Sequence, residues 1–282
     1  KEFVRHGTTA LEASSPWGVD PRTDLKVLRV LEAVRDKPLD VFPTHLLGVA
    51  PPQFQSAPEE HLAWLCTEML PRIRARRLAR SVHVRCGEGA YSAEQAHRIL
   101  SVARQLGFIP QVTTGESGSD GGVAAAVALE AASANRLDSV TAAEIQLLAN
   151  SVTIATLLPG VAFHRRLDRY PPGRELIDAG AAVALATGFS PDQCPSLSMP
   201  AILALACAEM SLTPAEAVTA ATINAAHTLH CANRLGSLEY GKDADLLMLN
   251  VGDYRELTYR FGVNLVAMVM KRGEVLFPRM EF

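Results

Sequence analysis

The feature that most constrains the fold is a regular alternation of apolar, β-branched runs with amphipathic segments along most of the chain. Apolar residues in the amphipathic segments recur at three- and four-residue spacing, which is typical of helices with one buried face. Such repeats predict parallel strands joined by right-handed crossovers, as a barrel or an open sheet. The seven predicted strands are Thr8–Ala13, Leu39–Leu46, Ser81–Cys86, Phe108–Thr113, Ala131–Ala134, Val152–Leu158 and Ala181–Thr187.

Three hydroxyl residues mark predicted helix starts, because a Ser or Thr side chain can accept a hydrogen bond from a free N–H of the first turn. These residues are Thr23, Ser92 and Thr141. On the strand Ser81–Cys86, His83 alternates with valines, so we expect it to be a core or hydrogen-bonded histidine rather than a ligand.

The character of the chain changes after Pro195, where a helical array is broken at Thr213-Pro214. The segments "GSLEYGKDADLLMLNV" and "GVNLVAMVMKRGEVLF" follow, and the second predicts a hairpin with Arg272-Gly273 at its turn. We therefore expect a (β/α) barrel over residues 1–235 and a small β appendage, an incomplete sandwich, over residues 236–282.

Composition excludes several classes of protein. With 282 residues, 48% hydrophobic and 20% charged, the chain is globular, and its net charge of −3 gives no reason to bind DNA. No apolar run reaches the roughly 18 residues of a membrane span. Five cysteines without a C-x-x-C pair indicate reduced thiols in an intracellular compartment, either the cytoplasm or the mitochondrion. Because the chain begins at Lys1 and not at a Met, a missing leader or N-terminal segment is one candidate for completing the fold.

Several short sequence motifs, in the same order along the chain, resemble those of the imidazolonepropionase family of amidohydrolases. They include "GTTALEASSPWGVD", "GEGAYSAEQAHRIL", "TIATLLPGVAF", "LIDAGAAVALAT", "LTPAEAVTAATINAA" and "FGVNLVAMVMKRG". The resemblance implies a barrel of eight strands with one zinc or iron ion at its C-terminal mouth. In that family the metal activates a water that opens an imidazolone ring, which gives formimidoyl-glutamate.

The family's site residues are replaced at the positions that the resemblance assigns. A ligand histidine falls on Thr113, a polarising histidine on Arg136 and the metal-binding aspartate on Gly188, while Glu116 matches the family's glutamate. Trp17 stands where the family has a tyrosine that contacts the substrate. Threonine is a poor zinc or iron ligand and arginine offers no lone pair, so we predict no catalytic residues, no metal and no cofactor.

Any ligand of the old cleft is expected to contact Trp17, Glu116 and Arg136. An aspartate introduced at Gly188 is expected to be nearly neutral for stability if that end of the strand remains wet. Restoring this one ligand is not expected to restore activity, because a metal site needs several donors together.

The predicted strands match the family's second to eighth strands, so the expected fold is an amidohydrolase barrel lacking its first strand. Open strand edges favour pairing with another chain, and we expect a protein partner or a missing N-terminal segment to complete the barrel and sandwich. The leading prediction is a non-catalytic structural or interaction subunit of a larger assembly. The alternatives are an imidazolonepropionase that hydrolyses imidazolone propionate with a metal ion, and a binding module that uses the old cleft.

Overall fold

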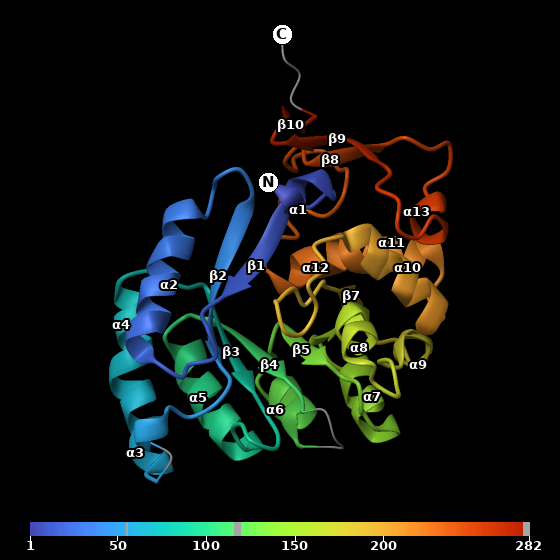
Figure 1. Ribbon diagram of the computed structural model, residues 1–282. Coiled ribbons are helices and arrows are strands. Elements are labelled where there is room, and N and C mark those ends of the chain that lie inside the picture. The colour runs from blue at the N-terminus through green and yellow to red at the C-terminus, as the bar shows by residue number, and fades with distance from the viewer. Residues whose placement is uncertain (55, 116–119, 279–282) are drawn as a thin grey trace. The chain divides into compact units, whose positions relative to one another are not determined.

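The computed structural model describes residues 1–282 except 55, 116–119 and 279–282, and it divides into two compact units (Figure 1). The five-strand unit is Leu11–Thr153, and the C-terminal unit joins Lys1–Ala10 to Ile154–Phe282. The predicted boundary between residues 235 and 236 lies inside the C-terminal unit and stays a prediction.

The strands of the five-strand unit follow one another in chain order. From β2 to β5 every pairing is parallel, with Leu46 opposite His83, His83 opposite Gln111 and Thr113 opposite Asn135. The carboxyl ends of these strands therefore meet at one edge of the sheet. The strands are β1 (Ala10–Ser14), β2 (Asp40–Leu47), β3 (Ser81–Arg85), β4 (Ile109–Thr113) and β5 (Ser133–Arg136).

Helices connect these strands and lie along them on the outside (Figure 1). The capping boxes predicted at Ser92 and Thr141 are present, and in each the hydroxyl accepts from the third backbone N–H of the helix. The start predicted at Thr23 is wrong, because the Asp20 side chain accepts the N–H groups of Arg22 and Thr23 and begins the helix at Pro21. The elements are α2 (Pro21–Val34), η1 (Pro52–Phe54), α3 (Pro58–Trp64), the π-helical η2 (Leu65–Met69), α4 (Leu70–Ala75), α5 (Ala93–Gln105), α6 (Gly122–Ala128) and α7 (Ala142–Ala149).

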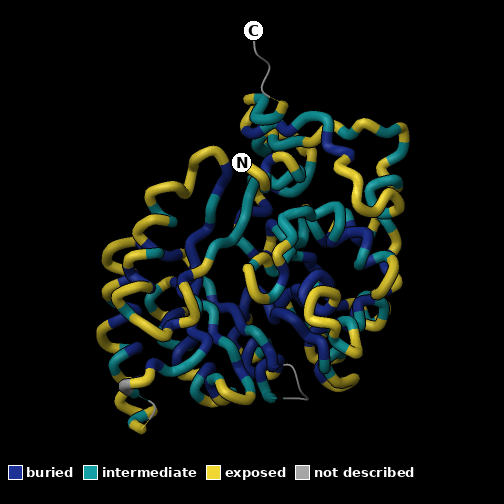
Figure 2. Tube along the Cα trace, viewed as in Figure 1, coloured by how far each residue is buried: buried dark blue, intermediate teal, exposed yellow. Residues whose placement is uncertain are grey.

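The two faces of this sheet differ in chemistry. Val82, Val84 and Val112 are fully buried on the face that α5 and α6 cover. The residues that alternate with them, His83, Gln111 and Thr113 among others, are polar and lie on the opposite face, because successive side chains of a strand point to opposite sides. Figure 2 shows the strands mostly buried and the outer sides of the helices exposed. A polar inner face therefore lies beside the apolar core.

The C-terminal unit holds a parallel pair of strands, β6 (Ile154–Leu157) and β7 (Val183–Leu185), and an antiparallel sheet of order β10-β9-β8. The predicted hairpin is confirmed, with Lys271 opposite Glu274 and positive φ at Arg272 and Gly273. The sheet comprises β8 (Leu246–Leu249), β9 (Val266–Lys271) and β10 (Glu274–Phe277). The helices are α1 (Glu2–Arg5), α8 (Pro159–Arg165), α9 (Gly173–Asp178), α10 (Met199–Glu209), α11 (Pro214–Ala221), α12 (Ile223–Thr228) and α13 (Glu256–Tyr259).

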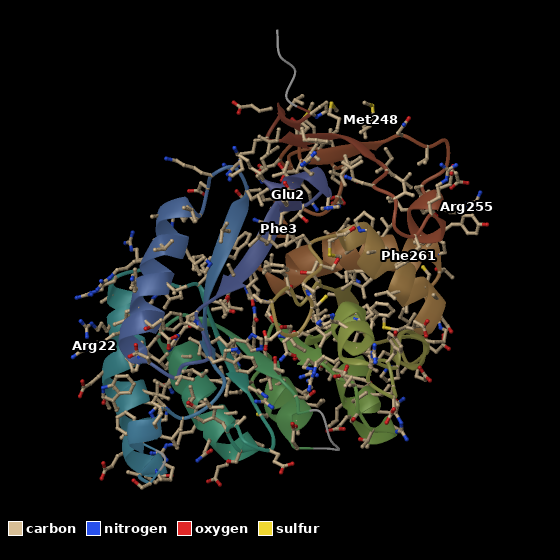
Figure 3. All side chains as sticks on the ribbon, viewed as in Figure 1. Glu2, Phe3, Arg22, Met248, Arg255 and Phe261 are labelled. Carbon is tan, nitrogen blue, oxygen red and sulfur yellow. The ribbon has the colours of Figure 1, made fainter. Side chains whose placement is uncertain are left out.

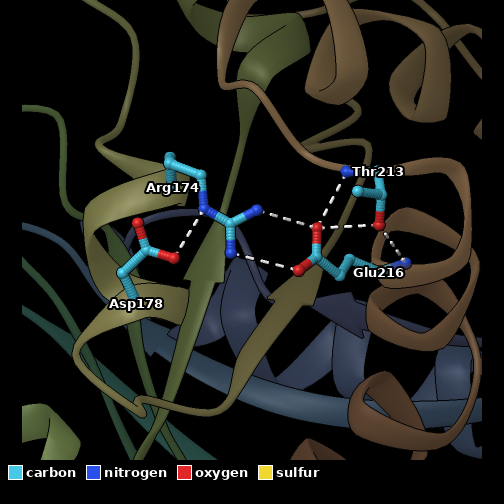
Figure 4. A network of polar contacts seen from close by, with 4 residues as sticks. All are labelled: Arg174, Asp178, Thr213 and Glu216. Atoms are coloured by element: carbon cyan, nitrogen blue, oxygen red, sulfur yellow. Dashed lines mark hydrogen bonds and ion pairs between the residues drawn. The ribbon is translucent and has the colours of Figure 1, made fainter.

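A network of charges joins α9 to the start of α11 (Figure 4). The guanidinium of Arg174 donates to both carboxylate oxygens of Glu216, at 3.0 and 3.1 Å, and to Asp178 at 2.9 Å. Glu216 also closes the capping box of Thr213, which confirms the predicted break before Pro214. Hydrogen bonds from Arg174 and from the backbone of Thr213 hold the pKa of Glu216 at about 2. Glu216 therefore stays charged and ties the two helices together.

A buried ion pair fixes the base of the C-terminal hairpin. The Nζ of Lys271 donates to Oδ2 of Asp245 at 2.6 Å, and the backbone N–H of Arg272 donates to its Oδ1 at 2.9 Å. Both charged side chains are only 6% exposed. The pair therefore satisfies the aspartate on both oxygens inside the sheet.

Other side chains of the C-terminal unit face solvent, such as Met248 and Phe261, labelled in Figure 3. Among the residues that the structure describes, no helix is both long and apolar enough to cross a membrane. A protein partner or additional segment stays a prediction.

Candidate functional site

Five polar side chains gather on the inner face of the five-strand unit. We call them the polar cluster: Glu12, His83, Gln111, Thr113 and Asn135. The amide Nε2 of Gln111 donates to Oε2 of Glu12 at 2.6 Å. The imidazole Nε2 of His83 lies 2.6 Å from Oγ1 of Thr113 and 3.1 Å from Nδ2 of Asn135. Four strands, β1, β3, β4 and β5, thus contribute two hydrogen-bonded sets, which face each other where Oε1 of Glu12 lies 4.0 Å from Nδ1 of His83.

The hydrogen bonds assign the proton on His83. With the amide of Asn135 oriented so that Nδ2 faces His83, Nε2 of His83 is the acceptor, and its single lone pair is shared with the hydroxyl of Thr113. The neutral ring then carries its proton on Nδ1, which faces Oε1 of Glu12 at 4.0 Å. Carboxyl, imidazole and hydroxyl follow in the order that activates a hydroxyl nucleophile.

Burial sets the charge of this group. It lowers the pKa of His83 to about 4, so the imidazole is neutral at pH 7 and keeps a lone pair on Nε2. Burial also raises the pKa of Glu12, against the opposing hydrogen bond from Gln111. The side chain of His83 is 11% exposed and that of Glu12 is 26% exposed. The arrangement can therefore accept a proton from Thr113 in a site largely screened from water.

Of the site residues predicted from sequence, the structure places Thr113 alone in the polar cluster. Arg136 ends β5, where its buried guanidinium pairs with Oδ2 of Asp138 at 3.2 Å instead of lining an open cleft. Glu116 lies outside the described residues. Trp17 follows β1, and Gly188 follows β7 in the C-terminal unit.

Sequence reasoning missed four members of the polar cluster: Glu12, His83, Gln111 and Asn135. His83 is hydrogen-bonded as predicted, but it was not connected with Thr113. The available signal was the alternation in "SVHVR" and "IPQVT", where polar residues two apart fall on one face of neighbouring strands. That signal identifies the face without identifying the partners.

The polar cluster does not fit a zinc or iron ion. His83 and Glu12 are the only members of the cluster with ordinary ligand atoms for these metals, and the Nε2 lone pair of His83 receives hydrogen bonds; the other members are a hydroxyl and amides, which are poor ligands. In the described part of the chain, no three His, Cys, Asp or Glu side chains come together as metal donors. We therefore derive no step through a metal, and its predicted absence stays a prediction.

Gly188 occupies a crowded position and has a left-handed backbone conformation that favours glycine. Its φ is +57°, and a Cβ there would lie 2.7 Å from Cγ2 of Val161, a buried residue of α8. An aspartate at this position was expected to be nearly neutral for stability if the strand end is open to water. The crowding around Gly188 shows that this condition is not met.

We expect Gly188→Asp to lower the free energy of unfolding by about 2 kcal/mol or more, from backbone strain and overpacking together. Chemical denaturation measures this. Gly188→Ala in a Val161→Ala background is the control, because it relieves the Cβ contact and leaves the φ strain. A loss below about 0.5 kcal/mol for Gly188→Asp would show that the position tolerates a side chain.

Comparison with known proteins shows the family of this chain. The Amidohydrolase family model matches residues 1–276. The imidazolonepropionase of Bacteroides thetaiotaomicron is 40% identical over 282 residues, which is 99% of this chain and 67% of that protein. The chain belongs to the imidazolonepropionase branch of the amidohydrolase family. The resemblance to this family that the short sequence motifs indicated is thereby confirmed.

Other members of this branch agree. The imidazolonepropionase of Geobacillus kaustophilus is 38% identical over 277 residues, which is 98% of this chain and 65% of that protein. The chain thus spans about two thirds of the length of the relatives that it matches.

Solved structures support the amidohydrolase fold. A zinc-bound adenosine deaminase from Xanthomonas campestris gives a TM-score of 0.73 at 20% identity, over 96% of this chain and 66% of that one. The ochratoxinase of A. niger gives 0.72 at 18% identity, over 97% of this chain and 73% of that one. The predicted fold, an amidohydrolase-type β/α barrel without its first strand and with a small C-terminal β portion, is confirmed.

The prediction of a non-catalytic structural or interaction subunit is wrong. The curated relatives at 37–40% identity are named imidazolonepropionases, and none is named as a structural subunit. That prediction weighed three replaced residues and overlooked the polar cluster, which joins one of them, Thr113, to an imidazole and a carboxyl.

Proposed function

We propose that the chain acts in an imidazolonepropionase-type hydrolase, which adds water across the C–N bond of a small cyclic amide such as imidazolone propionate. Its relatives carry that name over nearly the whole of this chain. The observation that carries the proposal is the order of Glu12, His83 and Thr113 on the inner face, where His83 is hydrogen-bonded to Thr113 and its Nδ1 faces Glu12 at 4.0 Å. That order supplies a nucleophile, a base and a group that orients the base.

The first half of the reaction is an acyl transfer to Thr113. Its Oγ1 attacks the ring carbonyl carbon while the hydroxyl proton passes to Nε2 of His83. The ring C–N bond then breaks, and the same proton passes to the leaving nitrogen. Glu12 accepts the Nδ1–H of the imidazolium in the meantime, which stabilises its positive charge.

Water completes the reaction. His83 takes a proton from a water molecule, whose oxygen attacks the new ester and releases a carboxylic acid. The proton returns to Oγ1 of Thr113, so the protein ends as it began. The sum is one water added for one C–N bond broken.

The test is turnover of imidazolone propionate by the purified chain, followed by the loss of its ultraviolet absorbance. We expect formimidoyl-glutamate as the product, identified by mass. A rate equal to the spontaneous reaction, with a folded protein, would contradict the proposed function.

The pH dependence distinguishes the roles of the two titrating groups. Both His83 and Glu12 must be deprotonated, so activity falls as the pH is lowered. The pKa of His83 is about 4 and burial raises that of Glu12, so Glu12 sets the acid limb.

We therefore expect Gln111→Leu to move the acid limb to higher pH, because it removes a hydrogen bond that lowers the pKa of Glu12. The pH profile of kcat/KM measures this shift. Gln105→Leu, which alters an exposed residue at the end of α5, is the matched control. If the acid limb of the pH profile does not move, the proposed role of Glu12 in the mechanism is contradicted.

A further inference from the structure

We propose that the amino edge of the five-strand unit carries a docking surface for a short acidic segment of a partner protein. Arginines of the stretch "PRIRARRLAR", residues 71–80, form it, and all of them are exposed. We call them the arginine surface: Arg72, Arg74, Arg76, Arg77 and Arg80. None of them belongs to the polar cluster, so the inference is independent of the proposed function.

The fold fixes the backbone that carries the arginine surface. The N–H of Arg80 donates to the carbonyl of Pro43 on β2 at 2.9 Å, and the carbonyl of Arg80 accepts from Ile109 on β4 at 3.0 Å. Arg80 therefore lies between β2 and β4, directly before the amino end of β3. Arg77 closes the end of α4 in a left-handed turn, with a φ of +52°, and its N–H donates to the carbonyl of Arg74 at 2.9 Å.

Two of the guanidinium groups lie over buried aromatic rings. The Cζ of Arg80 is 5.0 Å from the centroid of the Phe42 ring, and that of Arg74 is 5.9 Å from the centroid of the Phe108 ring. A Cβ at Gly107 would lie only 3.1 Å from Nη2 of Arg74, so the second guanidinium also lies close to the backbone. A ring covers one face of the planar group and leaves the N–H groups at its edge to form hydrogen bonds. These side chains are thus held in place without neutralisation of their charge.

The charge of the arginine surface is not balanced within the described part of the chain. Other exposed arginines have acidic partners, as Arg35, Arg98 and Arg260 each pair with a glutamate. Among the described residues, no such ion pair involves the arginine surface. Since the whole chain has a net charge of −3, this positive charge is local. Like charges that lie close together repel one another, and an anion bound among them relieves that repulsion.

The chemistry of the surface favours carboxylates of a short peptide segment. All of its cations are arginines, whose planar fork binds a carboxylate bidentately. Phe42 and Phe108 are buried beneath guanidinium groups, so these rings are not free to stack on nucleic-acid bases. Ile73 and Leu78 are buried as well, so the stretch exposes no large apolar side chain to a membrane. A long polyanion would extend beyond the surface to a chain that is negative overall, whereas a short acidic segment meets only the arginines.

Binding of an octaglutamate peptide tests this, with octaglutamine as the uncharged probe and fluorescence anisotropy as the measurement of Kd. We expect Arg74→Gln with Arg80→Gln to weaken octaglutamate by about tenfold or more, because two charge-assisted pairs are lost. Arg74→Lys with Arg80→Lys should weaken it less, because it keeps the charges and loses the fork. Added salt should weaken binding to the unaltered chain, because exposed charges are screened.

A charge-matched variant controls for the net charge of the protein. Lys26→Gln with Arg29→Gln removes the same charge from exposed residues of α2 and should leave the Kd unchanged. Thermal denaturation verifies that each variant is folded. If Arg74→Gln with Arg80→Gln does not fold, Arg72→Gln with Arg76→Gln serves instead, since both are exposed members of the surface.

Three outcomes overturn the inference. The first is no binding of octaglutamate by the unaltered chain, and the second is an equal loss of affinity in the α2 control. The third is arginine-dependent binding of an oligothymidylate or of phosphatidylserine vesicles that is tighter than the binding of octaglutamate, because the partner would then be a nucleic acid or a membrane.

Discussion

Thr113→Val is expected to lower kcat for imidazolone propionate by about a thousandfold or more, because it removes the nucleophile and keeps the shape of the side chain. The hydroxyl lies 2.6 Å from Nε2 of His83, and Thr113 is the one hydroxyl residue of the polar cluster, so no other member of the cluster can act as a hydroxyl nucleophile. Steady-state kinetics measures the loss, and KM should change little if Thr113 acts on the reacting bond rather than on binding.

Two further variants test whether the hydroxyl and the imidazole are the groups that matter. Thr113→Ser keeps a hydroxyl and should retain most of the activity, whereas His83→Gln keeps a hydrogen-bonding side chain and should lose it. A Thr113→Val protein with an undiminished kcat would exclude the covalent step. Mass spectrometry of quenched reactions offers a second readout, an acyl group on the peptide that contains Thr113.

Asp245→Ala is expected to lower the free energy of unfolding by about 3–5 kcal/mol, because it removes the carboxylate that forms an ion pair with the buried ammonium of Lys271. Asp245 also accepts the N–H of Arg272 at 2.9 Å, so the hairpin turn loses a second contact. Chemical denaturation at neutral pH measures the effect. Hydrogen exchange should show the largest loss of protection in β9 and β10, the strands of the C-terminal hairpin.

The double variant Asp245→Leu with Lys271→Met distinguishes the contribution of the ion pair from the cost of leaving one charge buried. Replacing both charges by apolar side chains should recover much of the stability, since no charge is then left buried. If Asp245→Ala costs less than about 1 kcal/mol, the pair does not hold the hairpin.

The sequence predicted the seven strands to within two residues at their ends, because the period and the β-branched residues are local properties of the chain. The helix starts at Ser92 and Thr141 are also local, since the cap and its partner are three residues apart. Thr23 failed as a cap because Asp20, three residues earlier, accepts its N–H and makes Pro21 the first helical residue. Asp20 and Thr23 are both common N-cap residues, so the sequence alone does not show which of them begins the helix.

The polar cluster could not be predicted in the same way. Glu12 and Gln111 are 99 residues apart, and His83 and Asn135 are 52 apart, so their contacts exist only once the strands are in register. The family resemblance directed attention to Thr113, Arg136 and Gly188 one by one. It identified what each residue had lost, and only the fold shows that Thr113 gained an imidazole partner.

The most direct test of the account is a turnover measurement on metal-stripped protein in the presence of a strong chelator, with imidazolone propionate followed by its ultraviolet absorbance. The polar cluster acts through Thr113, His83 and Glu12, so the account predicts the same rate with and without the chelator. A rate that disappears in the chelator and returns when zinc or iron is added would contradict it.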